Sequence, residues 1–214
     1  MTYLFNNLDY ILQLTLRHFQ LAIVPVAIAF IIAMPLGWLI NRYPRLSGFV
    51  ISFNNILYTI PSIALMIFLI PLLGLNARSV MTALVIYSQI ILLRNIIAGF
   101  QAIDPSILEA SRGMGMSPFQ IALRVQIPIA LPLILAGVRL ASVISVAIAT
   151  IGAKFGAGGL GVLLFEGIAQ AGRMDKIWIG AVFVGLLAFF FNRGILTVEK
   201  SISGRWMQSR QTPA

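Results

Sequence analysis

The sequence predicts an all-α membrane protein with about five transmembrane helices. Three observations lead to this fold class: 59% of the 214 residues are hydrophobic, only 10% are charged, and the mean hydropathy is +0.97. An average soluble domain carries about 25% charged residues, because its surface must stay solvated. A soluble fold of this length could not bury so many apolar side chains. The composition therefore excludes a soluble enzyme, a disordered regulator and a free nucleic-acid binder.

Several apolar runs are long enough to cross a bilayer, since a spanning helix needs about 20 mostly apolar residues. The first run, 21–40, ends before Arg42, and the second, 49–72, is expected to kink near Pro61. The other spans are expected at 79–102, 126–150 and 177–196, with a polar loop at 104–125. The sequence has no internal repeat and no linker, so residues 1–214 are predicted to form a single transmembrane domain.

The distribution of basic residues predicts the orientation of these spans. The net charge is +9, but the basic residues stand singly between apolar runs, which argues against a nucleic-acid partner. Lys and Arg are enriched in cytoplasmic loops. If the 104–125 loop is cytoplasmic, the N-terminus lies outside and the C-terminus inside; an even number of spans would break this argument. The basic residues then inside are Arg42, Arg45, Arg94, Arg112, Arg124, Arg193, Lys200, Arg205 and Arg210, and those outside are Arg17, Arg78, Lys154, Arg173 and Lys176.

The polar loop contains two helix starts. Asp104 can cap a helix that has Pro105 at its first position. Ser117 and Gln120 have the spacing of a capping box. Gly115 lies between the two starts and allows a sharp turn. The loop is therefore predicted to be two short helices at an angle.

The first short helix is expected to expose an apolar face around Glu109 and Arg112. Its members are Ile107, Leu108, Ala110 and Met114. Such a face fits docking into a groove of a partner protein, and it equally fits a helix that lies at the lipid interface. The residues themselves leave both interpretations open.

This loop resembles the EAA loop of ABC-importer permeases. The family pattern is Glu-Ala-Ala, three residues, Gly, nine residues, then Ile-x-Leu-Pro. Here Glu109-Ala110-Ser111 is followed at the same spacing by Gly115 and by Val125-Gln126-Ile127-Pro128, with conservative departures at Ser111, Val125 and Ile127. The resemblance implies a type I importer (MetI-like) fold whose coupling helix sits in a cleft of an ATPase subunit. It implies ATPase-coupling roles for Glu109, Ala110, Ser111, Gly115 and Pro128.

Other segments are similar to the osmoprotectant branch of these permeases, which imports glycine betaine, carnitine or choline under osmotic stress. They are Tyr58–Ala64, Leu93–Asn95, Glu109–Pro118, Leu131–Arg139 and Gly156–Gly161. This resemblance implies a multi-pass protein of a bacterial or archaeal inner (plasma) membrane. Permeases for amino acids such as methionine share the architecture, so an amino-acid substrate is one alternative. A secondary transporter or channel that needs no ATPase is another.

The resemblance also implies the partners of the chain. They are two ABC ATPase subunits, a second permease subunit (identical or homologous), an extracellular or periplasmic substrate-binding protein, and membrane lipid. No cofactor is expected on this chain, because it lacks a Gly-Lys-Ser/Thr phosphate loop. ATP and Mg²⁺ are expected on the ATPase. The chain is therefore predicted to be a transport subunit and not an enzyme, with no catalytic residue and no metal site.

The glycine-rich run from Gly156 to Gly161 has the spacing of a dinucleotide-binding loop. That spacing alone is a weak signal, and no βαβ unit surrounds it here. We interpret it as a tight turn outside the membrane, before a short helix. Contact with a binding protein and turn geometry alone both remain open.

Polar residues in the second predicted span are candidates for the translocation path. Asn55, Tyr58, Thr59 and Ser62 have the spacing of one helical face. Polar groups in hydrocarbon are costly unless they face protein or water. The face therefore either lines the path or only holds the bundle together by interhelical hydrogen bonds.

The fourth predicted span carries small residues at every fourth position: Gly137, Ala141, Ser145 and Ala149. Small residues let two helix backbones approach closely, so this row predicts a helix–helix seam within the subunit or across a dimer. Arg139 in the same span is expected to pair within the bundle rather than to meet a substrate carboxylate. His18 is given no role.

Overall fold

The computed structural model describes the backbone of residues 2–208 and the side chains of residues 3–201. Over this part the chain is helical, without a strand, which confirms the all-α prediction. The helices are α1 (Thr2–Asn6), α2 (Leu8–Arg42), α3 (Ser47–Thr59), α4 (Ser62–Leu73), α5 (Ala77–Gln101), α6 (Pro105–Gly113), α7 (Pro118–Ile121), α8 (Ile127–Gly152), α9 (Gly161–Ala169) and α10 (Met174–Gln208). Among the predicted basic positions, Arg210 lies outside the described residues and Arg205 is described by its backbone alone.

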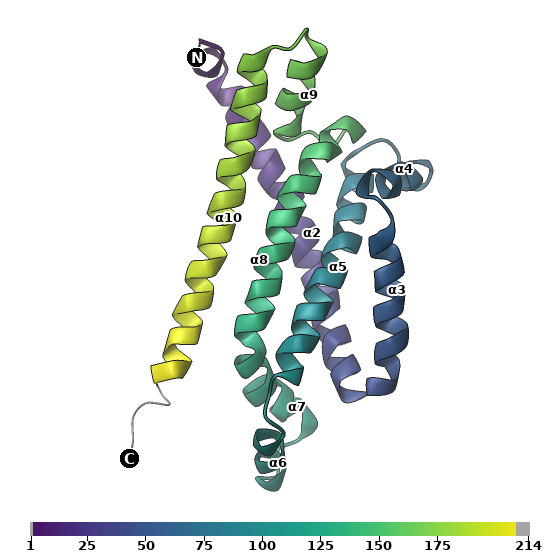
Figure 1. The fold of residues 1–214 in the computed structure, drawn as a ribbon, viewed down its shortest axis with the longest axis vertical. Helices are drawn as coiled ribbons and strands as arrows, with labels where there is room; N and C mark the ends of the chain where they lie inside the picture. Colours follow the sequence, from purple (N-terminus) through teal and green to yellow (C-terminus); the bar gives the residue numbers. More distant parts are fainter. Residues whose placement is uncertain (1, 209–214) are drawn as a thin grey trace.

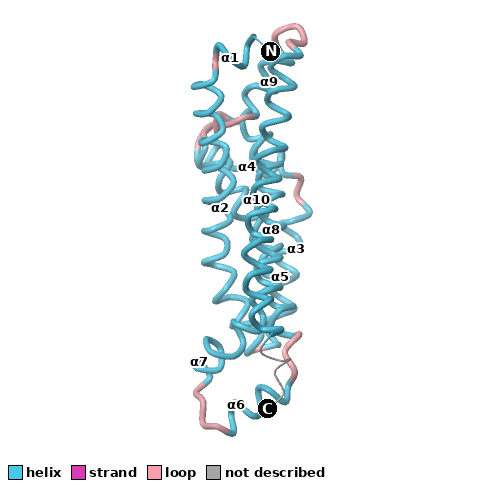
Figure 2. Tube along the Cα trace, turned by 90° about the vertical axis from the view of Figure 1, so that its left-hand side faces the viewer, coloured by secondary structure: helices cyan, strands magenta, loops and turns pink. Residues whose placement is uncertain are grey.

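The long helices form an elongated bundle (Figure 1). Helices α2, α5 and α8 pack together, α10 lies along one side against α8, and α3 lies along the other side against α5. Helices α6 and α7 lie at one end of the bundle, which we call the α6 end (Figures 1 and 2). The N-terminus and α9 lie at the opposite end, the α9 end. The N-terminus and the 104–125 loop are therefore on opposite sides of the bundle, as five spans require.

Four helices are long and apolar enough to cross a membrane, and a bent pair of shorter helices makes a fifth candidate. This confirms the prediction of about five spans. The bent pair is α3 and α4, which turn by 95° relative to one another. Ile60 is extended because it precedes Pro61, and a residue before proline is disfavoured in the helical region. The predicted kink near Pro61 is thus a complete break, and the freed carbonyl of Ile60 accepts a hydrogen bond from the Tyr87 hydroxyl.

The helices extend beyond the spans that hydropathy predicts. Helix α2 begins at Leu8, although the apolar run begins at Leu21, and it contains Arg17 and His18. These polar residues look like a boundary in the sequence because a charge is costly in hydrocarbon. In the fold both side chains find backbone partners on other elements, and a helix need not stop where the bilayer does. Helix α10 likewise runs past both ends of the predicted 177–196 span.

The core is built from small residues on one helix facing large residues on the next. Ala29 and Ala33 of α2 are fully buried in a cluster with Ile90 and Ile96 of α5 and Ile134 of α8. Small side chains at a helix contact bring the two backbones close together. The bundle therefore holds α5 and α8, the two helices that lead into the α6 end, firmly against α2.

Candidate functional site

The 104–128 segment forms a compact structure beyond the end of the bundle (Figures 1 and 2). Both predicted helix starts are present. The Asp104 carboxylate accepts a hydrogen bond from the Ser106 backbone N–H at 2.9 Å, and this bond lowers the pKa of Asp104. Ser117 and Gln120 form the reciprocal capping box, with distances of 3.3 and 2.8 Å. These caps satisfy backbone groups that each helix start would otherwise leave unpaired, which stiffens the segment.

The turn between the two short helices depends on Gly115. Its φ of +75° lies in the left-handed region, which is unfavourable for residues that carry a Cβ. A Cβ added at Gly115 would meet no atom within 4 Å, so the glycine is required by the backbone and not by space. The sequence therefore sets the angle between α6 and α7 at this one residue.

The two faces of α6 have different environments. Ile107 and Leu108 pack against the buried cluster at the end of the bundle, and the buried Ser111 hydroxyl donates to the Ile107 carbonyl at 2.7 Å. The prediction that α6 exposes Ile107 and Leu108 is therefore wrong, because the end of the bundle covers that face. Glu109 and Ala110 are exposed.

A separate set of apolar side chains points away from the bundle at this end. Met114 is 73% exposed, Phe119 is 65% exposed and Leu123 is 49% exposed. The sequence analysis included Met114 but missed Phe119 and Leu123, although both stand beside polar residues in the loop. Exposed apolar side chains grouped on a rigid support are typical of an interaction surface. We call Met114, Phe119 and Leu123 the apolar tip.

A π-helical turn over Ala122–Gln126 joins α7 to α8. The Ile127 N–H donates to the Ala122 carbonyl five residues earlier. Pro128 follows in the first turn of α8 and has no N–H to donate to a carbonyl of the preceding turn, which agrees with the irregular, π-helical hydrogen bonding there. The connection from α7 to α8 is thus helical throughout.

The polar residues of the second predicted span divide between two helices. Asn55, Tyr58 and Thr59 belong to α3, whereas Ser62 opens α4 beyond the 95° bend. The prediction that Ser62 shares a helical face with Asn55 is wrong, because the helix is interrupted between them. Asn55 accepts a hydrogen bond of 2.6 Å from Arg94 of α5, and this pairing could not be read from the sequence.

The other two polar residues of α3 also have partners. The Tyr58 ring packs edge-on against Tyr87 of α5, with 5.6 Å between the ring centroids. The Thr59 hydroxyl donates to the carbonyl of Ile56, one turn earlier, at 2.7 Å. Tyr58, Thr59 and Arg94 are all exposed on the surface of this chain. That this face lines a solute path therefore stays a prediction.

The row of small residues on α8 packs inside this chain. A Cβ on Gly137 would lie 2.6 Å from Cβ of Asn95 on α5. The Ser145 hydroxyl donates to the Ala22 carbonyl of α2 at 3.1 Å, and Ala141 and Ala149 are fully buried. The row therefore contacts α2 and α5 of the same chain.

Arg139, also on α8, forms an ion pair with Glu199 of α10. Its Nε atom lies 3.4 Å from a Glu199 carboxylate oxygen, and both side chains are partly buried. A charge in a helix bundle needs a counter-charge, because it has lost most of its hydration. The pair joins α10 to α8 far from the α9 end.

His18, to which the sequence assigned no role, is fully buried. Its Nδ1 accepts a hydrogen bond from the Leu160 N–H at 3.2 Å, so its Nε2 carries the proton and donates to the Val146 carbonyl at 3.1 Å. The adjacent Arg17 donates from Nε to the Ala157 carbonyl at 3.2 Å. Two neighbouring residues of α2 thus hold both halves of the 156–161 turn, which we call the glycine turn.

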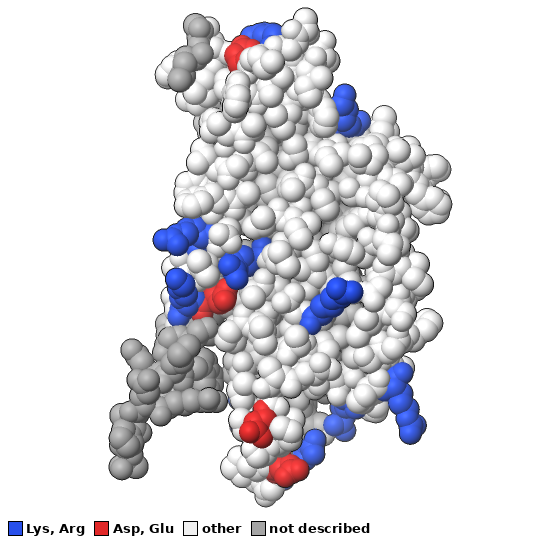
Figure 3. Space-filling model, viewed as in Figure 1, with Lys and Arg blue, Asp and Glu red and all other residues white. Residues whose placement is uncertain are grey.

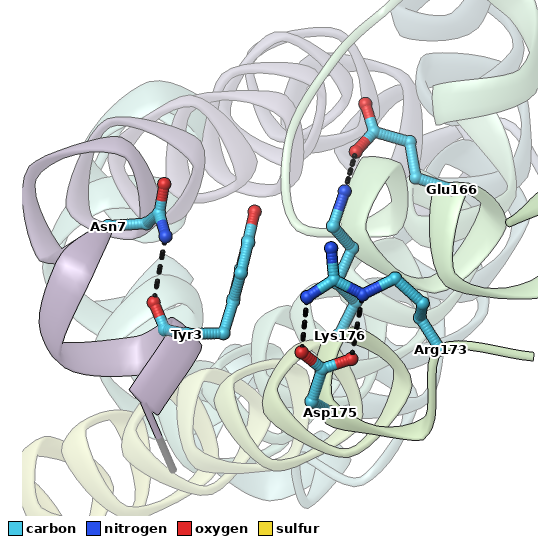
Figure 4. Close-up of polar contacts among 6 residues, drawn as sticks. All are labelled: Tyr3, Asn7, Glu166, Arg173, Asp175 and Lys176. Atoms are coloured by element: carbon cyan, nitrogen blue, oxygen red, sulfur yellow. Dashed lines mark hydrogen bonds and ion pairs between the residues drawn. The ribbon is translucent and has the colours of Figure 1, made fainter.

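At the α9 end, charged side chains also gather around Tyr3 (Figure 4). The Arg173 guanidinium lies 5.2 Å and the Lys176 ammonium 5.3 Å from the centre of the Tyr3 ring. Lys176 pairs with Glu166 of α9 at 2.9 Å, and Arg173 pairs with Asp175 at 2.6 Å. Cation–π contacts therefore join α1 to the start of α10, and the Lys176–Glu166 pair joins α9 to it.

Comparison with known proteins agrees with this fold and with the loop motif. The sequence model of the family "Binding-protein-dependent transport system inner membrane component" matches residues 26–203. The chain is 38% identical over 202 residues to the "Glycine betaine/carnitine/choline transport system permease protein OpuCD" of Bacillus subtilis (strain 168), covering 94% of this chain and 88% of that protein. It is 37% identical over 187 residues to the "Carnitine transport permease protein OpuCB" of Listeria monocytogenes, covering 87% and 85%.

Among solved structures, an inward-facing form of the MetNI methionine ABC transporter matches with a TM-score of 0.83. The match covers 90% of this chain and 95% of that chain at 21% sequence identity, which shows a shared fold. The fold, the loop motif and the family match lead to one conclusion. The chain belongs to the family of binding-protein-dependent transport system inner membrane components, the ABC-importer permeases.

Proposed function

We propose that this chain is the permease subunit of an ATP-driven importer for compatible solutes of the glycine betaine, carnitine and choline type. The relatives whose names carry these solutes match nearly the whole chain, as one domain, at 37–38% identity. The observation that carries the transport mechanism is the apolar tip on a capped, helical segment between α5 and α8. The methionine transporter resembles this chain at 21% identity, so that likeness supports the fold and not an amino-acid substrate.

The structure of the 104–128 segment supports a mechanical role. The segment begins directly after α5 and continues without a break into α8. An ATPase subunit that binds ATP and Mg²⁺ and closes would move its docking cleft. Because the caps and the π-helical turn keep the segment stiff, this movement would displace α5 and α8 together and change the side to which the path opens. Glu109 and Ala110 would contact the ATPase, while Ser111, Gly115 and Pro128 maintain the shape of the segment.

The charge distribution supports an orientation with the α6 end in the cytoplasm. Figure 3 shows Lys and Arg side chains gathered on the lower half of the molecule, the half that carries α6 and α7 in Figure 1. The upper half of that face is almost free of charge except toward its tip. Since Lys and Arg favour cytoplasmic loops, the N-terminus would lie outside and the C-terminus inside. A solute-loaded binding protein would then dock at the α9 end.

The polar face of α3 supports a path beside a second permease subunit. The Arg94–Asn55 pair is exposed on this chain, between helices of the membrane bundle. A guanidinium is costly in contact with lipid tails, so this face is best explained by water or by a second permease, identical or homologous. Asn55, Tyr58 and Thr59, with Ser62 at the bend, would then line the solute path.

The proposal is tested by uptake in proteoliposomes that contain the complete complex. We expect uptake of labelled glycine betaine only with ATP inside the vesicles. Phe119→Asp places a charge in the apolar tip, so it should abolish co-purification of the ATPase and lower uptake at least about tenfold. Phe5→Asp is the matched control, because Phe5 is 75% exposed at the α9 end, and it should leave co-purification unchanged. Uptake without ATP, or normal coupling in Phe119→Asp, would contradict the proposal.

A further inference from the structure

A polar cavity of about 400 Å³ opens at the α6 end between α2, α6, α7 and the π-helical turn. Its polar lining comes from three parts of the chain. Trp38, Asn41 and Arg42 lie in the last turns of α2, Arg112 lies on α6, and Gln126 lies in the π-helical turn. The cavity is thus shared between a long membrane helix and the segment that we expect to contact the ATPase.

The cavity carries two positive charges without a counter-charge. Among the described side chains, no carboxylate lies within salt-bridge distance of Arg42 or Arg112. Glu109 is one turn before Arg112 on α6 but is exposed and forms no such pair, and Asp104 is bonded to the Ser106 N–H. Two guanidinium groups beside amide side chains favour a phosphate, because the planar guanidinium matches phosphate oxygens in charge and geometry.

The surface next to the cavity identifies the source of that phosphate. Val24, Ile28, Ile31, Pro35, Trp38 and Arg42 recur at spacings of three and four residues and so form one stripe along α2. Val24, Ile28 and Ile31 are exposed, up to 71% for Ile31, as expected for a surface in contact with lipid tails, whereas Trp38 is half-buried. The stripe ends at Trp38 and Arg42, in the cavity, and tryptophan is enriched at the head-group level of the bilayer.

We propose that this cavity binds the head-group phosphate of an anionic phospholipid, with the acyl chains lying along the α2 stripe. Arg42 holds the phosphate from the membrane helix, and Arg112 holds it from α6. Binding therefore couples the lipid composition of the leaflet to the position of the 104–128 segment. The site is independent of the transported solute, and its occupancy can be measured without transport.

The test uses Trp38 as a reporter inside the cavity. The sequence has three tryptophans, so the W178F/W206F double variant leaves Trp38 alone. The full chain is placed in phosphatidylcholine nanodiscs that contain either brominated phosphatidylglycerol or brominated phosphatidylcholine at equal mole fraction. We expect stronger quenching of Trp38 by the brominated phosphatidylglycerol. Arg42→Gln and Arg112→Gln should each lower this preference about fivefold, the effect expected for one basic residue at an anionic surface.

Arg45→Gln is the matched control, because Arg45 is an exposed arginine in the adjacent turn that does not line the cavity. It should keep the preference for phosphatidylglycerol, and Arg112→Lys should keep part of it. Equal losses in Arg45→Gln and Arg112→Gln would show general surface attraction and overturn the proposal. Inorganic phosphate and chloride are compared at equal ionic strength. If phosphate reduces the quenching by brominated phosphatidylglycerol more than chloride does, the cavity binds a soluble anion and the proposal is overturned. Loss of the preference in the complete complex would assign it to the ATPase.

Discussion

Two turns at opposite ends of the bundle contain glycines at positive φ, and the surroundings of these glycines differ. In the 104–128 segment, a Cβ added at Gly113 or Gly115 would meet no atom within 4 Å. In the glycine turn, a Cβ at Gly159 would lie 3.0 Å from the His18 ring, and one at Gly161 would collide with the Thr150 carbonyl oxygen. The first turn leaves free space around its backbone, and the second is packed against its own chain.

This difference fits the proposal that the 104–128 segment contacts another protein, whereas the glycine turn is packed within its own chain. The 104–128 segment satisfies its backbone locally, through its own caps, and leaves the apolar tip exposed. The glycine turn is held by Arg17 and His18 from a distant part of the chain. Changes in the first turn should therefore affect coupling more than stability, whereas changes in the second should affect stability directly.

The largest effect is expected from Gly161→Ala. The added methyl would collide with the α8 backbone, which cannot move aside easily, so we expect a loss of about 3 kcal/mol or more in the free energy of unfolding. Gly185→Ala on α10 is the control, because nothing lies within 4 Å of its Cβ position. The measurement is reversible unfolding in mixed detergent micelles. A Gly161→Ala variant as stable as the control would show that the glycine turn is not closely packed.

A smaller loss is expected from His18→Leu, which keeps the volume but removes both hydrogen bonds. The buried N–H of Leu160 would lose its partner, at a cost of about 1–3 kcal/mol. Gln20→Leu changes an exposed neighbour on α2 and should stay within about 0.5 kcal/mol of the wild type. The same unfolding measurement compares the two variants. If both variants lose stability equally, the hydrogen bonds of His18 do not stabilise the glycine turn.

Gly115→Ala and Gly113→Ala form a matched pair in the 104–128 segment. Only Gly115 has a positive φ, so its substitution should cost about 1–2 kcal/mol locally and change the angle between α6 and α7. Gly113→Ala lies within α6 and should be neutral or slightly stabilising. ATP-dependent uptake should fall several-fold in Gly115→Ala alone. Equal uptake in both variants would mean that the angle is unimportant for coupling.

The smallest effect concerns pH and the Asp104 cap. The hydrogen bond from Ser106 lowers the pKa of Asp104 in the folded protein, so the ionised form contributes stability above the unfolded-state pKa. This contribution is lost as the pH falls through the lowered pKa. Amide exchange at Ser106 should therefore speed up in acid, relative to the intrinsic rate. Asp104→Asn still caps the helix but cannot titrate, so it should not show this acid response. An identical response in the two proteins would contradict the assignment.

The parts of the fold that the sequence could predict are those that depend on neighbouring residues. Asp104 caps its helix through Ser106, and Ser117 through Gln120, so both helix starts are written within a few positions. The contact between His18 and Leu160 joins positions 142 residues apart, and no local pattern encodes it. Apolar runs likewise predict the spans, because the hydrocarbon core of the bilayer requires apolar side chains. They do not predict the orientation of each helix within the bundle.

The errors have the same origin. The prediction that Asn55 and Ser62 share one face required an unbroken helix, whereas the helix is interrupted at Pro61. The outward position predicted for Ile107 and Leu108 assigned this face to a partner protein or to lipid and did not consider contact with the end of the bundle itself. In the fold, the end of the bundle covers one side of α6. Periodicity gives the faces of a helix, and only the tertiary structure determines which face is covered.

The length of α2 has a consequence for how other proteins meet this one. Its 35 residues extend about 52 Å at 1.5 Å per residue, well beyond a hydrocarbon core of about 30 Å. With Trp38 at one head-group layer, the first residue of α2 lies about 45 Å away along the helix, so the first turn of α2 rises about 10–15 Å above the opposite edge of the hydrocarbon. The charged group around Tyr3 then lies outside the hydrocarbon layer, at the end of α2. A protein arriving from that side would make contact there, with little need to penetrate the bilayer.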